Sequence, residues 1–464
     1  MNRATSASRS HPTTLAALLG AIALVVAACG AAASPTPSAT APPTSPGATA
    51  TPTGPAETPA ATPAPSGYTG PEVTIEYSIW GDPTEIANQQ KIVDAFHAAS
   101  PRITVKVTIS DWDTYWDKLL TGLAGGAAPD VFAMDGPLFP DYQSRDVLVD
   151  LTPYVERDAY DLGQLDDNAV RDFRTADDHQ FGLPRDLNVI VLFYNKGLFD
   201  AAGIAYPDDT WNWARLVEVG KQLTVDTDGD GTVDQWGLYT ETTDMENYWS
   251  SLVWQNGGDI LAADGASTVL DTDAAVGGLQ FLQDLIWKEK ILPEPALFAE
   301  TGDAFEQGKA AMEANGSWLV PTHLAAGIDL GVAPLPKGPA GAATSVNPTG
   351  AVVYKGTKAP DAAWEFVKYL ASPAAQEQLM QLKASLPVNK EVLAGPYASS
   401  FEGAMVMADA LAYAHLKPSF KGYDSFVTVL QTELDENVFN APNETARQAI
   451  DKVKDQLNAI LAGT

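Results

Sequence analysis

A regular alternation of strand and helix patterns at the start of the folded part is the feature that most constrains this chain. Strand patterns there alternate apolar and polar residues, and helix patterns repeat apolar residues every three or four positions. Five segments follow one another: a strand over 73–79, a helix over 86–100, a strand over 103–109, a helix over 111–126 and a strand over 129–133. Because strands joined by helices lie parallel in one sheet, this order predicts an α/β fold with helices covering a parallel sheet.

Three aromatic or acidic residues follow the predicted strands at one edge of that sheet. Trp80 and Asp82 come after the first strand, and Asp135 follows the third. Taken singly, Trp80 fits a core position and Asp82 fits the cap of the next helix. Ligands of open α/β sheets bind outside the carboxyl ends of the strands, so the joint position favours a ligand site. An indole face covers the apolar side of a sugar while carboxylates accept from its hydroxyls, which favours a saccharide.

A second series of elements begins at Leu183. The apolar run 189–194 is typical of a buried strand. Later patterns predict a strand over 330–333 and helices over 209–223, around Trp249 and Trp254, and over 274–290, 362–382 and 441–461, the last without an evident cap. The folded part, residues 68–464, is long enough to form two lobes with separate cores.

The only cysteine of the chain, Cys29, follows the apolar run 15–28, which itself follows the basic residues Arg3 and Arg9. This arrangement is typical of a secretion signal, and the run is shorter than the roughly 20 apolar residues that a membrane-spanning helix needs. Residues 26–29 resemble a bacterial lipobox, in which a peptidase cuts before the cysteine and the new first residue is lipidated. We therefore expect a signal peptide over residues 1–28 and a lipid anchor on Cys29; ordinary secretion and an uncleaved anchor are the alternatives.

The segment that follows Cys29 is predicted to be a disordered tether over 29–67. It consists almost entirely of Ala, Pro, Thr, Ser and Gly, with Glu57 as its single charge. Such a composition buries too little apolar surface to fold. If Cys29 carries lipid, no thiol remains for a disulfide, a thiolate metal site or a cysteine nucleophile.

The charge balance restricts the partners of the chain. With 28 basic and 59 acidic residues, the formal net charge is −31. A surface of this sign repels phosphate backbones, which excludes nucleic acid as an expected partner. It also disfavours anionic ligands, although a pocket can be locally basic.

Residues 226–237 match most of an EF-hand calcium loop. Gly231 stands at the sixth position, where the loop turns sharply, and Gly237 stands at the twelfth, where an EF-hand has a bidentate glutamate. The expected ligands are the side chains of Asp226, Asp228, Asp230 and Asp234 and the backbone carbonyl of Thr232. An acid from elsewhere in the chain would complete the shell, and a solvated acidic turn is the alternative. The loop predicts a structural Ca²⁺ rather than a switch.

Motifs of catalytic sites are absent from the sequence. The chain has no Gly-x-Ser-x-Gly elbow, phosphate loop, dinucleotide fingerprint or His-Glu-x-x-His motif, and its histidines after the signal are dispersed. With 59 acidic residues, a pair of carboxylates near a cleft is expected by chance, so a glycosidase stays an alternative on this evidence. We expect a protein without catalytic residues.

Several segments together resemble the extracellular solute-binding proteins of bacterial ABC importers, in particular the maltose-binding-protein-like family that serves sugar transporters. They occur in family order: 193–204, 210–211 with the helix to 224, 254–258, 305–312 with 316–318, and 362–366 before 386–387. The resemblance covers nearly all of 71–464. It implies an α/β, two-lobed periplasmic-binding-protein-like fold with hinge crossovers and a ligand cleft between the lobes. The implied N-lobe is 68–186 with 350–415, and the implied C-lobe is 187–349 with 416–464.

The resemblance also implies where a ligand binds. The positions that contact sugars in the family fall here on Trp80, Asp82, Asp135, Asn188, Asn247, Tyr248, Trp249, Trp318, Tyr413 and Tyr423. Trp318 is the strongest of these, because that place in the family commonly holds a stacking aromatic. Calcium loops like 226–234 also occur in members of the family.

The function implied is that of a receptor on the outer face of the cell membrane, lipid-anchored or periplasmic. It would trap a sugar or oligosaccharide between its lobes and deliver it to the transmembrane subunits of an ABC permease, and we expect it to be a monomer. Three alternatives remain: a binding protein for a non-sugar solute such as a polyol or peptide, a surface glycosidase, and a calcium-dependent adhesion module.

Overall fold

The structure, a computed structural model, describes residues 67–240, 248–297 and 302–463, all within one compact unit that spans Pro59–Thr464. The predicted signal peptide, Cys29, the tether up to residue 66 and the predicted ligand residue Asn247 lie outside the described residues.

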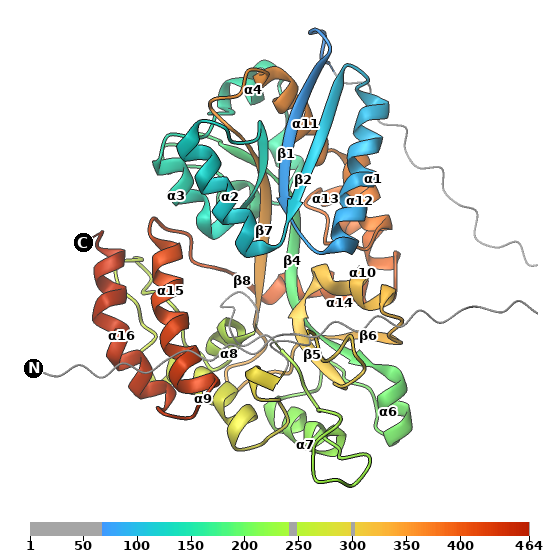
Figure 1. Cartoon of the computed structure of the whole chain (residues 1–464), viewed down its shortest axis with the longest axis vertical. Helices are drawn as coiled ribbons and strands as arrows, with labels where there is room; N and C mark the ends of the chain where they lie inside the picture. Colours follow the sequence, from blue (N-terminus) through green and yellow to red (C-terminus); the bar gives the residue numbers. More distant parts are fainter. Residues whose placement is uncertain (1–66, 241–247, 298–301, 464) are drawn as a thin grey trace, which may run out of the picture. The chain divides into compact units, whose positions relative to one another are not determined.

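Three parallel strands form the first part of the sheet. They are β2 (Ile103–Ser110), β1 (Val73–Trp80) and β3 (Val131–Asp135), in the spatial order β2-β1-β3. Helices α1 (Pro83–Ala99) and α2 (Trp112–Gly125) connect them (Figure 1). The strand and helix order predicted from the sequence is confirmed, and the carboxyl ends of all three strands meet at one edge.

Two long antiparallel strands join this part of the sheet to the rest. They are β4 (Gly182–Asn195) and β7 (Thr344–Val353), which pair through 182–189 of β4 (Figure 1). Beyond that pairing, β7 adds β3 and the short strand β8 (Ala414–Leu416), while β4 adds β5 (Met312–Gly316) and β6 (Leu330–Ala333). A strand pair that passes from one half of the sheet to the other is the crossover expected of a two-lobed α/β fold.

A proline in the middle of β7 is accommodated by the pattern of strand pairing. Pro348 lies opposite Leu187 of β4, and Leu187 exchanges both of its backbone hydrogen bonds with Leu386 on its other side. The nitrogen of Pro348 therefore faces away from β4. On that side β3 pairs with 349–353 and β8 with 344–346, so neither strand needs a donor at Pro348.

The remaining helices cover the sheet on both halves. Their bounds are α3 (Phe139–Ser144), α4 (Thr152–Arg157), α5 (Asp167–Asp172), α6 (Lys196–Ala202), α7 (Trp213–Leu223), α8 (Trp249–Gln255), α9 (Asp273–Trp287), α10 (Val320–Ala325), α11 (Pro360–Leu370), α12 (Pro373–Gln381), α13 (Lys390–Ala394), α14 (Ala404–Ala410), α15 (Tyr423–Leu434) and α16 (Ala446–Leu461). No helix of the described segments combines the length and the apolar character needed to cross a bilayer.

The two halves have separate apolar cores. One contains Ile75 of β1, Val131 of β3 and Trp364 of α11, all less than 1% exposed. The other contains Leu279 of α9 and Ile450 of α16, with further residues of α7, α8 and α15. The last part of the chain thus packs with the second half. A hydrogen bond also joins them, since Gln283 of α9 donates to the carbonyl of Glu444 at 2.8 Å. The predicted residue limits of the lobes stay a prediction.

Two helix predictions were wrong in detail. The single helix predicted over 362–382 is two helices, because Pro373 stands at the first position of α12 and Ser372 caps it. The helix predicted over 441–461 begins only at Ala446. Contrary to the expectation of no cap, Thr445 accepts from the Gln448 amide while the Gln448 side chain accepts from the Thr445 amide, a capping box.

Candidate functional site

A cleft of about 310 Å³ lies at the carboxyl edge of the parallel strands. Its walls come from the segments after β1, β2, β3 and β5, and its floor from the crossing strands β4 and β7. The volume falls at the small end of the range for ligand pockets, which suits one or two sugar rings. The cleft lining consists of Trp80, Gly81, Asp82, Glu85, Asp111, Trp112, Asp135, Arg185, Asn188, Trp318, Asn347, Thr349 and Ser385.

The cleft contains part of the residue set predicted from the sequence. The predicted residues that line it are Trp80, Asp82, Asp135, Asn188 and Trp318. Four others lie elsewhere: Tyr248 and Trp249 are 1% and 2% exposed in the second core, Tyr423 is buried beside the first lobe's helices, and Tyr413 is half-buried. Trp249 opens α8, whose seven residues are all buried, so its indole serves packing.

The indole of Trp80 belongs to an aromatic cluster. Its ring centroid lies 5.0 Å from that of Trp112 and 5.2 Å from that of Tyr115, both edge-on. Edge-on packing holds the ring in place while it lines the cleft. Trp80 therefore packs against the core and also lines the cleft, and its contact with a ligand stays a prediction.

Trp112 is a cleft residue that the sequence analysis missed. It is 36% exposed and follows Ser110, the last residue of β2, which pairs with Trp80. The rule that located Trp80 at the end of the first strand, applied to the second strand, would have found it. Asp111 stands at the start of the helix predicted over 111–126. It does cap α2, accepting from the Thr114 amide at 3.0 Å, and it also lines the cleft.

Trp318 on the opposite wall is positioned by a glycine. A Cβ added to Gly316 would lie 2.0 Å from the Trp318 ring, so the indole lies flat against the backbone at the end of β5. The φ of Gly316 is −78°, which any residue adopts, so close approach of the ring is the reason for glycine here. Ser317 is buried between them and donates to Asn188 at 3.2 Å.

Asp82 caps a helix, as one interpretation predicts, and also lines the cleft. Its Oδ1 accepts from the amides of Thr84 at 2.6 Å and Glu85 at 2.8 Å, which caps α1. Its Oδ2 accepts from the hydroxyl of Thr322 on α10 at 2.6 Å. Asp82 therefore links an element of the first half to one that follows Trp318.

Glu85 completes the capping box of α1 and faces the cleft. Its Oε2 accepts from the Asp82 amide at 2.8 Å. Burial raises the pKa of Glu85 to about 7, with a further contribution from the charge of Asp82. Asp111 behaves in the opposite way, since the hydrogen bond from the Thr114 amide holds its pKa below the usual value.

The floor of the cleft is a hydrogen-bonded layer on β4 and β7. The register of β4 shifts between Pro184 and Asp186, and this irregularity turns Arg185 into the cleft. Asp186, which is 0% exposed, accepts from the Nε of Arg185 at 2.8 Å and from the hydroxyl of Thr349 at 2.5 Å. Burial alone would lower the pKa of Arg185, but Asp186 and Tyr77 together raise it above its usual value.

One donor on this floor has no partner among the described residues. Asn347 is 3% exposed, and its Oδ1 accepts from the hydroxyl of Ser345 at 3.0 Å. Its Nδ2 makes no hydrogen bond within the described part of the chain. A buried amide of this kind costs free energy unless something accepts from it, so it points to a ligand oxygen.

The acidic loop 226–237 gathers carboxylates outside the cleft. Asp226, Asp228 and Asp234 each offer an oxygen, and these oxygens all lie within 4.8 Å of one another. Asp226 accepts from the Gly229 amide at 2.7 Å and from the Gly231 amide at 2.8 Å, so loop amides support its two oxygens. Three hard oxygen donors around a tight turn fit Ca²⁺.

The remaining loop positions differ from a complete EF-hand. Asp230 accepts from the Thr232 amide at 2.7 Å and is not one of the three gathered acids. At the twelfth position, a Cβ on Gly237 would lie 2.1 Å from the Gly220 carbonyl oxygen of α7. No side chain fits there, which explains why the bidentate glutamate is absent.

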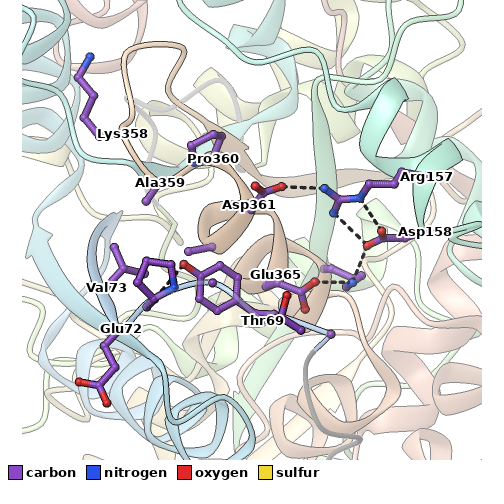
Figure 2. A pocket seen from close by; sticks show the side chains of 16 residues that line it. Thr69, Glu72, Val73, Arg157, Asp158, Lys358, Ala359, Pro360, Asp361 and Glu365 are labelled. Atoms are coloured by element: carbon purple, nitrogen blue, oxygen red, sulfur yellow. Dashed lines mark hydrogen bonds and ion pairs between the residues drawn. The ribbon is translucent and has the colours of Figure 1, made fainter.

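A larger cavity of about 780 Å³ lies at the other end of β1, beside Val73 (Figure 2). Arg157 donates to Asp361 at 2.7 Å and to Asp158 at 2.8 Å, and Lys368 pairs with Asp158 and with Glu365. These charged groups thus satisfy one another (Figure 2). Since β1 has eight residues, roughly 25 Å of strand separates the two cavities.

Comparison with known proteins gives matches over most of the chain. The family described as bacterial extracellular solute-binding protein matches residues 80–377. An ABC substrate-binding protein of Listeria monocytogenes, solved in complex with cycloalternan, is similar with a TM-score of 0.77 and 27% identity, covering 84% of this chain and 99% of that chain.

Two curated relatives match at lower identity. A putative binding protein of Brucella abortus is 24% identical over 348 residues, which is 73% of this chain and 82% of the relative. The maltotriose-binding protein of Pyrococcus abyssi is 25% identical over 351 residues, which is 73% of this chain and 72% of that protein.

Proposed function

The chain belongs to the bacterial extracellular solute-binding proteins, and on that premise we propose that it captures a saccharide in the cleft for delivery to an ABC permease. The observation that carries this proposal is a cleft with two tryptophan walls above a floor of hydrogen-bonding groups. Trp80 and Trp112 form one wall, and Trp318 forms the other. Indole faces cover the C–H side of a sugar ring, and carboxylate and amide groups satisfy its hydroxyls. The ligands of the Listeria and Pyrococcus proteins support a saccharide.

Ligand capture would draw the two halves together about the crossing strands. Trp80 ends β1 and Trp112 follows β2, whereas Trp318 follows β5 on the other side of the β4 and β7 crossover. A sugar that contacts both walls is bound better when they are close, so binding favours the closed arrangement. The protein would release the same molecule that it bound.

A thermal-shift screen of the purified protein against a carbohydrate panel tests this proposal. At least one mono- or oligosaccharide should raise the Tm, and calorimetry should then give one site per chain. Mass spectrometry of that saccharide after long incubation should show it intact. No stabilisation by any saccharide, with stabilisation by a peptide or polyol, would refute the saccharide assignment, and cleavage of the sugar would point to a glycosidase.

We propose Ca²⁺ as a structural ion of the acidic loop, held by Asp226, Asp228 and Asp234. An ion that binds only the folded state stabilises it by about 2.7 kcal/mol at a hundredfold excess over its Kd. Added Ca²⁺ should raise the Tm of chelator-treated protein, and Asp228→Asn should lose most of this rise. Equal Tm values with Ca²⁺ and with chelator would contradict the proposal.

We propose that Cys29 anchors the mature protein to the outer face of the membrane. Cells fed a fatty acid with an alkyne tag should label the parent and should not label Cys29→Ser. Release of the parent into the medium without label would leave ordinary secretion as the explanation.

A further inference from the structure

The cleft carries far more negative than positive charge. Four carboxyl groups line it, those of Asp82, Glu85, Asp111 and Asp135. Arg185 is the one basic side chain among the described residues of the lining.

The charge of Arg185 is already balanced within the protein. Its Nε and Nη2 donate to one oxygen of the buried Asp186 at 2.8 and 2.5 Å, and its Nη1 donates to the hydroxyl of Tyr77 at 3.2 Å. Asp186 is 0% exposed, so the pair is shielded from solvent. Arg185 therefore offers little net charge to a ligand and does not offset the four carboxylates.

A second cation lies behind the cleft wall. The Nζ of Lys417 lies 3.6 Å from Asp135, and its charge also acts on Asp172. Lys417 thus offsets at most one of the four cleft carboxylates. Asp82 and Asp111 remain without a basic partner among the described side chains of the lining. Glu85 adds little charge at pH 6, because burial raises its pKa to about 7.

The aromatic walls favour the same ligand charge. Trp80, Trp112 and Trp318 all line the cleft, and Trp is the best aromatic partner of a cation within about 6 Å of its ring. Stacking alone would serve a neutral ring. The combination of indole faces with carboxylates that lack a basic partner in the lining favours a ring that carries a positive group.

The floor of the cleft adds an opposite requirement. The buried Nδ2 of Asn347 has no partner among the described residues and needs an oxygen that accepts from it. A protonated linear polyamine has donors only, and an anionic sugar would face the carboxylates. A ligand that meets both requirements has hydroxyl or ring oxygens together with an ammonium group.

We propose that the cleft prefers a saccharide that carries a protonated amine over its neutral counterpart. This inference rests on the proposed function, because it specifies the class of saccharide bound at the same site. An oxygen of the sugar accepts from the Nδ2 of Asn347 on the floor, and the indoles cover the ring. The ammonium group donates to the carboxylates on the α1 and α2 side of the cleft.

Matched pairs of sugars test the preference by calorimetry at pH 6 and low salt, where the amines are protonated. Suitable pairs are glucose with glucosamine, galactose with galactosamine, and cellobiose with the fully deacetylated chitosan disaccharide. In at least one pair the amine should bind tenfold or more tightly than the neutral sugar. Added salt should narrow this ratio, because screening weakens charge interactions at an open cleft.

A variant that removes one carboxylate separates the effect of charge on affinity from the effect of ligand shape. Asp111→Asn keeps a good helix cap for α2 and removes one carboxylate, so the ratio of amine to neutral affinity should fall at least threefold. The matched control is Asp166→Asn, which changes the capping residue of α5 away from the cleft and should keep the parental ratio.

Each outcome bears on one proposal or the other. Equal or tighter binding of the neutral member in every pair overturns the amine preference and leaves the saccharide receptor standing. Binding of spermidine in the absence of any saccharide binding overturns both. An unchanged ratio in Asp111→Asn also contradicts the electrostatic explanation.

Discussion

The two cavities at the ends of β1 differ in a way that size does not reveal. In the larger one, beside Val73, Arg157 is paired with Asp158 and Asp361, while Glu72 and Lys358 also line it (Figure 2). The smaller one exposes indole faces and keeps a buried amide that has no partner in the described part of the chain. A saccharide site needs stacking faces together with donors that the protein leaves unused, and of these two cavities the smaller one combines them.

The largest expected effect on ligand affinity comes from Trp318→Ala. Loss of the stacking wall should weaken binding of the identified saccharide tenfold or more, which is about 1.4 kcal/mol, with little change in the Tm of the ligand-free protein. Calorimetry of parent and variant measures this. The control at the other cavity, Arg157→Ala, should bind with parental affinity; a larger loss there than in Trp318→Ala would reverse the assignment of the two cavities.

Gly316→Ala should reproduce much of that loss without touching the ligand. The new methyl group would meet the indole at 2.0 Å, so Trp318 must turn away from its position. We expect a drop in affinity of roughly tenfold, or about 1.4 kcal/mol. The φ of −78° suits alanine, so backbone strain adds nothing. Parental affinity in this variant would show that the orientation of the indole is unimportant.

The cleft should also differ from the larger cavity in how its residues make the free energy of unfolding depend on pH. Since burial raises the folded-state pKa of Glu85 from 4.5 to about 7, its contribution to stability is fully present below pH 4.5 and is lost as the pH rises through 7. Relative to Glu85→Gln, the parent should lose at most about 3 kcal/mol across this interval. Urea unfolding at several pH values measures the difference, and parallel curves would contradict it. Asp361→Asn at the other cavity is the control.

Asn347→Ala tests the unused donor directly. The ligand should lose one hydrogen bond, about 1 kcal/mol, which is a several-fold drop in affinity. The stability of the ligand-free protein should change little, because removal of an unpaired buried amide is offset by loss of the hydrogen bond from the buried Ser345 hydroxyl. A destabilised ligand-free protein with unchanged affinity would mean that the amide serves the fold rather than the ligand.

The sequence predicted the fold better than the site. Alternating patterns and helix signals identified the parallel strands and placed Trp80, Asp82 and Asp135 at their carboxyl edge, since those features depend on neighbouring residues. Trp318 and Asn188 came from the family resemblance. Asn347 and Arg185 could not be found this way, because they enter the cleft through strand pairing and a register shift between segments far apart in the chain.

The resemblance also pointed to residues that the cleft does not contain. Tyr248 and Trp249 stand at positions that match the family, yet both are buried in the second core. Burial of a helix on all sides is a property of tertiary packing, and the short α8 pattern does not distinguish it from a helix with one face at a site.

The indole N–H signals of the eleven tryptophans give the most direct test of the central claim, that the tryptophan-walled cleft is where the saccharide binds. In ¹⁵N-tryptophan-labelled protein, titration with the identified saccharide should shift the signals of Trp80, Trp112 and Trp318 most strongly, assigned by single substitutions. The signal of Trp364, whose Nε1 donates to Asp158 at the other cavity, should stay in place. Saturation that moves Trp364 and leaves the three cleft indoles unchanged would contradict the account.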